Sequence, residues 1–248
     1  MQVRGITVYK NYIFDFYGTL ADIRTDEDNF RLWKKMSEIY RALGAGYKPQ
    51  ELRRAFRRME QREKAKLGGE NAEPDLTRVF ALLFYDKNVS CDDSQAKMTA
   101  ITFRALSRRF LRAYDGVEEL LEELRRRDRK LYLLSNAQTD FTRPEIEMLG
   151  LTRFFDGIVL SSEQGCKKPS PAFFRKLLEQ YGLEPSESIM IGNDGTADIS
   201  GARSVGMDTL YLRTAISPEE QGEINATYCV MDGDFRKAAG ILLGTGFR

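Results

Sequence analysis

The chain has 248 residues, 42% hydrophobic and 30% charged, which is enough for one large α/β domain or for a core with a smaller domain beside it. Its 38 basic residues balance 37 acidic ones, which argues against nucleic acid as the main partner, because binding to a phosphate backbone normally needs a basic surplus. Histidine does not occur in the sequence, which excludes Ser-His-Asp catalysis and histidine-ligated zinc or iron within this chain.

The cysteines and the apolar segments bear on where the protein works. Cys91, Cys166 and Cys229 are widely separated and make no metal-ligand pattern, and sparse cysteines suit a reducing compartment. The first residues lack the apolar stretch and cleavage site of a signal peptide. The longest apolar run, residues 79–85, is too short to cross a bilayer. We therefore expect a cytoplasmic protein with no membrane partner.

The first predicted strand, Tyr12–Phe16, is short and apolar throughout, as expected for a parallel strand covered on both faces. The interval that follows, residues 21–114, shows no convincing strand, and Gly68-Gly69 marks a break between helices within it. Its amphipathic helical patterns cover Phe30–Leu43, Gln50–Lys66, Leu76–Tyr85 and Gln95–Arg112. We therefore predict a helical cap at residues 21–114, inserted into a core formed by residues 1–20 and 115–248.

After the cap, helical and apolar patterns alternate. Val117–Arg127 has leucines at helical spacing, and Phe173–Tyr181 follows a Ser-Pro start signal. Ser217 fits a capping box with Glu220 three residues later, which predicts a further helix start. Five more strands are predicted at Leu131–Leu134, Gly157–Leu160, Ser188–Ile191, Thr209–Leu212 and Thr227–Met231. The alternation predicts an α/β fold with an open, doubly wound parallel sheet.

Candidate functional residues follow the predicted strands, at the sheet edge where doubly wound folds bind ligands. Each residue taken alone has an ordinary explanation in a turn, a helix cap or a surface loop. Together they bring a nucleophile, a hydroxyl donor, a cation and an acidic pair to one edge. They are Asp15 with Gly18 and Thr19, Ser135 with Asn136, Lys168 with Pro169, and Asn193 with Asp194 and Asp198.

Four segments around these residues read IFDFYGTL (Ile13–Leu20), LYLLSN (Leu131–Asn136), GCKKP (Gly165–Pro169) and IGNDGTADISGARSVGM (Ile191–Met207). In order and spacing they resemble the haloacid dehalogenase superfamily of aspartate-nucleophile hydrolases. The resemblance is to the subfamily that carries a helical cap between the first two motifs. It spans the core on both sides of the cap and leaves the cap sequence unmatched.

The resemblance implies a role for each motif. Asp15 would be the nucleophile, forming an aspartyl ester or aspartyl phosphate that water then cleaves. Lys168 would lie near Asp15 and neutralise negative charge on the transferring group. Ser135 and the backbone N–H of Asn136 would bind a substrate oxygen, and Gly18 and Thr19 would complete the phosphate-binding set.

The resemblance also implies a Mg²⁺ ion, which accepts a few oxygen ligands and keeps several waters. Asp15 and the backbone carbonyl of Tyr17 would supply two of these oxygens. A third would come from Asn193 or Asp194, because the phosphatase patterns GDxxxxD and GDxxxD fit this segment in two registers. Asp198 would be a further ligand, or would orient the waters and Lys168.

Tyr17 is the main departure from the family pattern. Family phosphatases carry a second aspartate two residues after the nucleophile, as general acid for the leaving oxygen. A phenol can donate a proton but is a poor base for the later attack by water. Tyrosine at this place resembles the 2-haloacid dehalogenases, in which a halide leaves without protonation.

The acidic pair Asp194 and Asp198 favours a site built around a cation. We therefore predict Mg²⁺-dependent hydrolysis of a small phosphorylated metabolite through an aspartyl phosphate. Two alternatives stay open: a metal-independent hydrolase similar to the 2-haloacid dehalogenases, and a non-catalytic binding or regulatory protein. The sequence identifies neither the substrate nor the oligomeric state.

Overall fold

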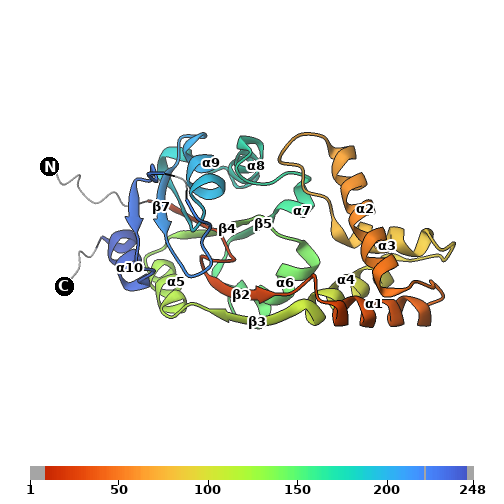
Figure 1. Cartoon of the computed structure of the whole chain (residues 1–248). Coiled ribbons are helices and arrows are strands. Elements are labelled where there is room, and N and C mark those ends of the chain that lie inside the picture. The colour runs from red at the N-terminus through yellow and green to blue at the C-terminus, as the bar shows by residue number, and fades with distance from the viewer. Residues whose placement is uncertain (1–8, 221, 245–248) are drawn as a thin grey trace.

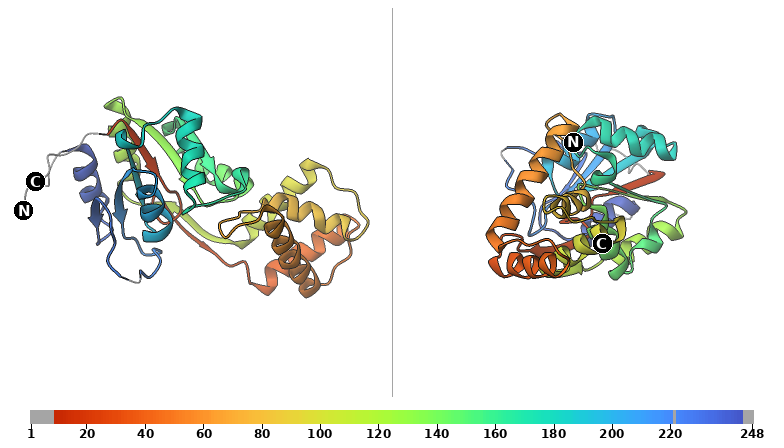
Figure 2. Two further views of the ribbon diagram at one scale, coloured as in Figure 1. Left: turned by 90° about the horizontal axis from the view of Figure 1, so that it is seen from above. Right: turned by 90° about the vertical axis from the view of Figure 1, so that its right-hand side faces the viewer.

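The computed structural model describes residues 9–220 and 222–244. These residues form two lobes joined by a narrower middle (Figure 2). The α/β lobe carries both ends of the described chain, and the helical lobe, residues 30–107, lies at the opposite end (Figure 1). None of the helices in the described part of the chain has the length and apolar content needed to cross a membrane.

A six-stranded sheet forms the centre of the α/β lobe, in the order β5-β4-β1-β6-β7-β8. All five pairings are parallel, and the six segments predicted as strands from the sequence all lie in this sheet. The strands are β1 (Asn11–Phe14), β4 (Lys130–Ser135), β5 (Gly157–Leu160), β6 (Ser188–Gly192), β7 (Asp208–Leu212) and β8 (Tyr228–Val230). The predicted doubly wound α/β fold is confirmed.

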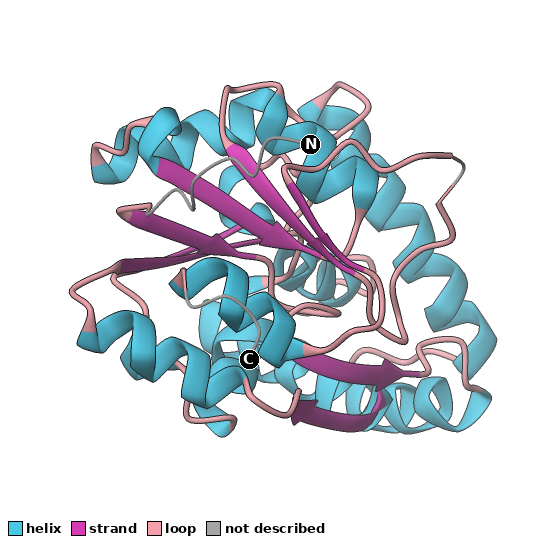
Figure 3. Cartoon of the chain, turned by 90° about the vertical axis from the view of Figure 1, so that its left-hand side faces the viewer, coloured by secondary structure: helices cyan, strands magenta, loops and turns pink. Residues whose placement is uncertain are grey.

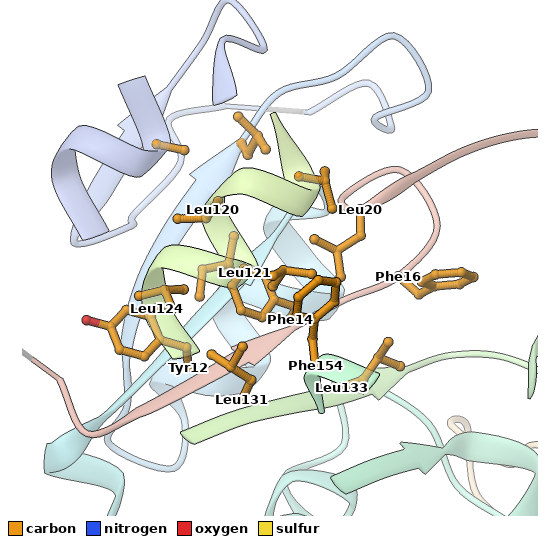
Figure 4. Packing of buried hydrophobic residues seen from close by; sticks show 14 of the residues in the cluster. Tyr12, Phe14, Phe16, Leu20, Leu120, Leu121, Leu124, Leu131, Leu133 and Phe154 are labelled. Carbon is orange, nitrogen blue, oxygen red and sulfur yellow. The ribbon is translucent and has the colours of Figure 1, made fainter. Parts of the chain in front are cut away.

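Helices cover both faces of this sheet (Figure 3), which explains why its strands are apolar throughout. Residues along β1 alternate between the two faces. Tyr12 and Phe14 pack against leucines of α5 (Val117–Arg126), as Figure 4 shows. Ile13 packs on the other face with Phe173 of α8 (Pro171–Tyr181). Burying one such side chain contributes about 1.5–3 kcal/mol, so the two apolar layers account for much of the stability of this lobe.

The remaining elements of the α/β lobe are mostly short. They are α6 (Thr139–Met148), α7 (Ser161–Gln164), α9 (Gly201–Arg203), α10 (Phe235–Leu243), 3₁₀ turns at Thr152–Phe154 and Pro185–Glu187, and a π-helical segment at Gly195–Ser200. The chain fills the sheet outward from β1 in two directions, first through β4 to β5 and then through β6 to β8. The order therefore reverses at β1, and this switch point is where open α/β sheets bind ligands.

Four helices form the helical lobe: α1 (Phe30–Ala42), α2 (Pro49–Leu67), α3 (Leu76–Tyr85) and α4 (Asp93–Ser107). They enclose an aromatic core of their own, in which Trp33 packs against Phe56 and Phe103. One residue of the α/β lobe, Phe141 on α6, completes this core by stacking on Phe103. Helix α2 ends before Gly68, at the break predicted from the sequence.

Two strands join the lobes. β2 (Ala21–Thr25) leads into the helical lobe, and β3 (Arg108–Ala113) returns antiparallel beside it. The expectation that residues 21–114 contain no strand is therefore wrong, and the helix predicted to reach Arg112 ends at Ser107. The sequence of β3, RRFLRA, lacks an apolar run because much of the strand is exposed. Its partner lies more than 80 residues away in the sequence, so no local sequence pattern predicts the pairing.

Candidate functional site

Three loops that leave the sheet at the switch point carry most of the candidate residues, and a fourth, after β5 and α7, carries Lys168. Asp15 directly follows β1, Ser135 is the last residue of β4, and Asn193 directly follows β6. The N–H of Asp15 donates to the carbonyl of Ile191 at 2.9 Å, which extends the β1–β6 pairing to the start of the first loop. Parallel pairing of these three strands therefore brings the loops to one edge, as the sequence predicts.

Asp15 is buried and held through a single carboxylate oxygen. Lys168 Nζ donates to Asp15 Oδ1 at 2.6 Å, and Ser135 Oγ donates to the same oxygen at 3.0 Å. Lys168 Nζ also donates to the carbonyl of Leu134 at 2.8 Å. Both side-chain bonds to the carboxylate end on Oδ1, so they fix the carboxylate and neither of them occupies the other oxygen, Oδ2.

Lys168 also forms an ion pair with Asp198, whose Oδ1 lies 2.6 Å from Nζ. Burial opposes the charged form of Lys168, but the carboxylates of Asp15 and Asp198 outweigh it and raise the pKa of the ammonium. Burial raises the pKa of Asp198, and the neighbouring ammonium of Lys168 opposes this. Lys168 is therefore a fixed positive charge shared by two buried carboxylates.

In the acidic loop after β6, Asp194 has a structural role. The side chain of Asp194 caps the π-helical segment, accepting from the N–H groups of Thr196 at 2.9 Å and Ala197 at 2.7 Å. The backbone N–H of Asp194 donates to Asp198 Oδ2 at 3.0 Å. The carboxylate of Asp194 is thus engaged by its own helix end, as an N-cap, while Asn193 precedes it.

Asn193 lies against the first loop. A Cβ on Gly18 would come within 2.3 Å of Asn193 Nδ2, and the φ of Gly18 is +84°, so this contact requires glycine. Thr19 Oγ1 donates to Asn193 Oδ1 at a long 3.4 Å. Gly18 and Thr19 therefore lie behind Asn193, and Thr19 is fully buried. Their expected role in binding phosphate stays a prediction.

Asn136 connects the loop after β4 with the loop that carries Lys168. Its amide nitrogen donates to the carbonyl of Lys168 at 3.0 Å, and its Oδ1 accepts from the N–H of Lys168 at 2.8 Å. This reciprocal pair fixes the backbone from which the Lys168 side chain extends. The side chain of Asn136 is thus occupied with holding Lys168, which is compatible with the backbone role expected for Asn136.

These loops surround a cavity of about 290 Å³. Of the candidate residues, Asp15, Tyr17, Ser135, Asn136, Lys168, Asn193, Asp194 and Asp198 all line it, together with Ala197, Ile216 and Pro218. The structure therefore brings the predicted nucleophile, hydroxyl, cation and acidic pair together. Gly18 and Thr19 are not among these lining residues, but both lie against Asn193, which is.

Ile216 and Pro218 were missed because their segment was interpreted as a helix start. The structure has residues 217–220 in a loop instead, so the predicted capping box at Ser217 is wrong. Ser217 Oγ accepts from the N–H of Thr214 at 2.9 Å, and Glu220 Oε1 accepts from the N–H of Gly195 at 2.6 Å. Both side chains that suggested a cap thus hold a loop over the cavity, which is an alternative use of the same hydrogen-bonding groups.

Tyr17 has a different environment from the other loop residues. Its hydroxyl donates to Glu145 Oε2 and lies 3.0 Å from Thr142 Oγ1, both on α6. Burial raises the pKa of Tyr17, Arg104 partly opposes this, and Glu145 raises it further. The phenol proton is therefore directed at Glu145. A role of this hydroxyl as proton donor to a substrate would require that bond to break first.

The oxygen donors around the cavity suit a hard cation that keeps water ligands. Among the described residues, no three Cys, Asp or Glu side chains are grouped so as to hold a metal ion by themselves. Mg²⁺ is commonly bound by one or two carboxylates, waters and the phosphate groups of a substrate. Asp15 and Asn193 line the cavity, and one carboxylate and one amide oxygen fit that limited set.

Comparison with known proteins agrees with the geometry. Residues 9–206 match a family model described as haloacid dehalogenase-like hydrolase. The chain is 35% identical over 107 residues to phosphoserine phosphatase of Thermus thermophilus, a match that covers 43% of each protein. It is 24% identical over 193 residues to glyceraldehyde 3-phosphate phosphatase of Methanopyrus kandleri, covering 78% of this chain and 70% of the relative.

Two solved structures show the same fold along nearly the whole chain. The 2-haloacid dehalogenase of Pseudomonas syringae has a TM-score of 0.66 at 17% identity, covering 96% of this chain and 99% of that one. A phosphatase of Thermococcus onnurineus has a TM-score of 0.59 at 21% identity, covering 94% and 97%. In the curated phosphoserine phosphatase, by contrast, the match spans less than half of the relative's length.

Proposed function

Because the chain belongs to the haloacid dehalogenase-like hydrolase family, we propose that it is a Mg²⁺-dependent phosphatase of a small phosphorylated metabolite. Asp15 is the nucleophile in this proposal, and the helical lobe is the cap that covers the site. The names of the relatives in the matched region support this choice, since they are phosphatases of small phosphorylated compounds.

The charge balance of the cavity carries the proposal. Asp15, Asp194 and Asp198 line it, and Lys168 is the single basic residue among the described lining residues. Two unit charges 4 Å apart interact by about 4 kcal/mol at an effective dielectric constant of about 20. A phosphate dianion would therefore be repelled from this cavity, and a divalent cation would reverse the balance.

In the proposed reaction, Asp15 Oδ2 attacks phosphorus while the bond to the leaving oxygen breaks. The resulting aspartyl phosphate is cleaved by water, which regenerates the carboxylate and releases inorganic phosphate. Ser135 and Lys168 hold Asp15 Oδ1 during the attack, so the nucleophile enters in one orientation. Lys168 also offsets the negative charge that gathers on the phosphoryl oxygens.

Mg²⁺ would neutralise phosphoryl charge and hold the substrate in line with Asp15. The residues proposed to bind it are Asp15, the backbone carbonyl of Tyr17 and the side chain of Asn193. Asn193 is preferred to Asp194 because the Asp194 carboxylate already caps the π-helical segment. Asp198 is proposed to act through Lys168, to which it is paired.

Tyr17 favours one competing function. A tyrosine two residues after the nucleophile replaces the expected acid, and a halide leaves without needing one. The competing proposal is a 2-haloacid dehalogenase-like hydrolase that needs no metal. A 2-haloacid carries one negative charge and no phosphoryl oxygens to bridge a cation, so this reading leaves the acidic lining of the cavity without a use.

A parallel assay separates these functions. Phosphate esters and 2-haloacids are each incubated with the protein in Mg²⁺ and in EDTA. Phosphate release that needs Mg²⁺ supports the proposal, and halide release that persists in EDTA supports the competing function. Asp15→Asn serves as the control for both, because the amide keeps the shape of the side chain but is not a competent nucleophile. Turnover of neither class would point to a binding or regulatory protein.

A further inference from the structure

Glu145, on α6 of the α/β lobe, is a buried carboxylate that the proposed chemistry does not use. Its side chain is 1% exposed, although glutamate is almost never fully buried unless it is paired. Arg104 Nε donates to Glu145 Oε1 at 2.8 Å, and Arg104 Nη2 donates to Oε2 at 3.2 Å. Arg108 Nη1 donates to Oε1 at 3.1 Å, and the Tyr17 hydroxyl donates to Oε2. The carboxylate is therefore fully engaged.

The partners of Glu145 come from separate parts of the chain. Arg104 lies in the last turn of α4 in the helical lobe, and Arg108 is the first residue of β3, which joins the lobes. Tyr17 lies two residues after the nucleophile. One carboxylate thus connects the helical lobe, the connecting strand and the nucleophile loop.

Arg104 also contacts two aromatic rings beside Glu145. The guanidinium of Arg104 lies 5.4 Å from the ring centroid of Tyr17 and 5.4 Å from that of Phe141. Phe141, on α6 one turn before Glu145, packs into the aromatic core of the helical lobe. Arg104 is therefore held by a bidentate ion pair and two aromatic faces, a setting that lysine cannot reproduce.

The arrangement makes the Tyr17 contact depend on the helical lobe. If α4 moved away from α6, Arg104 would leave both the Glu145 carboxylate and the ring of Tyr17, so one displacement would remove a partner from each. A buried charge without its ionic partner is strongly unfavourable. Docking of α4 and fixing of Tyr17 are thus favoured together.

We propose that Glu145 is a positioning residue that couples docking of the helical lobe to the conformation of the nucleophile loop, through Tyr17. The inference rests on the proposed function for its kinetic consequence, since it holds that Asp15 is presented correctly when α4 is docked. Its structural part, the link between α4 and Tyr17, does not depend on which reaction the chain catalyses.

The kinetic test is Glu145→Gln, which keeps the size of the side chain and removes its charge. Glu147→Gln, the same change at an exposed position of the same helix, is the matched control. Glu145→Gln is expected to lower kcat on the order of 10²-fold, as misplaced catalytic groups do, with a smaller change in KM. Glu147→Gln is expected to leave both unchanged. An unchanged kcat in Glu145→Gln overturns the proposal.

Amide hydrogen exchange of the substrate-free protein tests the link between the lobes. Glu145→Gln is expected to speed exchange in β2, β3 and the end of α4, and to leave α8 at the wild-type rate. A fall in kcat with no change in this exchange would overturn the coupling, because Glu145 would then act on the loop alone. Absence of any turnover in wild type would remove the proposed function, and exchange would still decide whether α4 and Tyr17 are linked.

A second pair of variants serves if Glu145→Gln does not fold. Arg104→Lys keeps the charge but loses the bidentate fork and the stacking, and Arg109→Lys is its exposed control in the chain. Arg104→Lys combined with Tyr17→Phe is expected to lower kcat by less than the product of the single effects. The reason is that both changes interrupt the same chain of contacts, from Arg104 through Glu145 to Tyr17. Effects that multiply would mean that Arg104 and Tyr17 act independently, against the proposal.

Discussion

The ammonium of Lys168 and the carboxylate of Asp198 form an ion pair at 2.6 Å in which neither side chain is open to solvent, at 1% and 2% exposure. Asp15 is held by the same ammonium at the same distance. The pair therefore does more than balance one charge, because it fixes the position of the cation that holds the nucleophile. Gly192 makes room for it, since a Cβ there would lie 2.3 Å from the Asp198 side chain.

Replacing Lys168 by methionine should remove this shared cation and leave two carboxylates facing each other without a counter-charge. Breaking a buried pair in this way typically costs about 3–5 kcal/mol. We expect a matching loss in the free energy of unfolding, measured with urea, together with loss of turnover. Lys168→Arg is the control that keeps the charge. A Lys168→Met protein of wild-type stability would show that the two carboxylates do not depend on the ammonium.

The metal register can be tested by separating ligation from capping. If Asn193 is the ligand, Asn193→Ala should raise the Mg²⁺ concentration for half-maximal turnover by at least about 10–100-fold. Asp194→Ser keeps a capping oxygen and should leave that concentration near the wild-type value. Asp194→Ala should lower the free energy of unfolding by about 1 kcal/mol through the lost cap. A large shift in the Mg²⁺ requirement of Asp194→Ser would instead assign Asp194 as the ligand.

Tyr17 should make the proposed phosphatase sensitive to its leaving group. With the phenol proton directed at Glu145, simple alkyl phosphates should react slowly. Aryl and acyl phosphates should be affected less, because their leaving groups are weaker bases and need less protonation. General acid catalysis is typically worth about 10²–10⁴-fold, so Tyr17→Asp should raise the ratio of alkyl to aryl turnover, even where loss of the bond to Glu145 lowers both rates. The measurement is the ratio of alkyl to aryl rates in wild type, Tyr17→Phe and Tyr17→Asp.

Two results would separate the alternatives for Tyr17. If the ratio is the same in wild type and Tyr17→Asp, the position does not accommodate a general acid. If Tyr17→Asp depresses halide release and confers nothing on phosphate esters, the residue serves dehalogenation. Tyr17→Phe should leave the ratio unchanged if the hydroxyl does not protonate the leaving group.

Gly18 and Gly150 offer a matched pair for the close approach of Asn193. Both have positive φ, +84° and +69°, but space around Gly150 is open within 4 Å, whereas a Cβ on Gly18 meets Asn193. Gly150→Ala should cost about 1–2 kcal/mol from its backbone conformation alone. Gly18→Ala should cost more and should also impair turnover by displacing Asn193. Equal losses of stability and full activity in both variants would mean that the loop adapts without moving Asn193.

The sheet could be predicted because each of its strands is identified by the residues of that strand alone. Each parallel strand is buried on both faces, so a short apolar run identifies it, and its following loop then falls at a known edge. The sequence alone therefore predicts that Asp15, Ser135 and Lys168 lie at one edge of the sheet. β3 could not be found in this way, because an exposed strand between the lobes carries arginines and depends on a partner distant in sequence.

The missed parts of the site depend on choices that the local sequence leaves open. Ser217 and Glu220 have the spacing of a helix cap, yet their oxygens accept from Thr214 and Gly195 in a loop. Asp194, placed as a metal-site residue by its spacing, is also a cap. Glu145 had no motif at all, because its partners converge on it only in three dimensions.

The position of the single tryptophan makes the two lobes optically distinguishable. Trp33 is the one tryptophan in the chain, and it is buried in the aromatic core of the helical lobe, with its indole N–H on the carbonyl of Glu27 at 2.8 Å. Fluorescence excited at the red edge of tryptophan absorption therefore reports the helical lobe alone, whereas far-ultraviolet circular dichroism reports both lobes. Denaturation curves that coincide for the two signals would mean that the lobes melt as one cooperative unit, and separated curves would give the helical lobe a stability of its own.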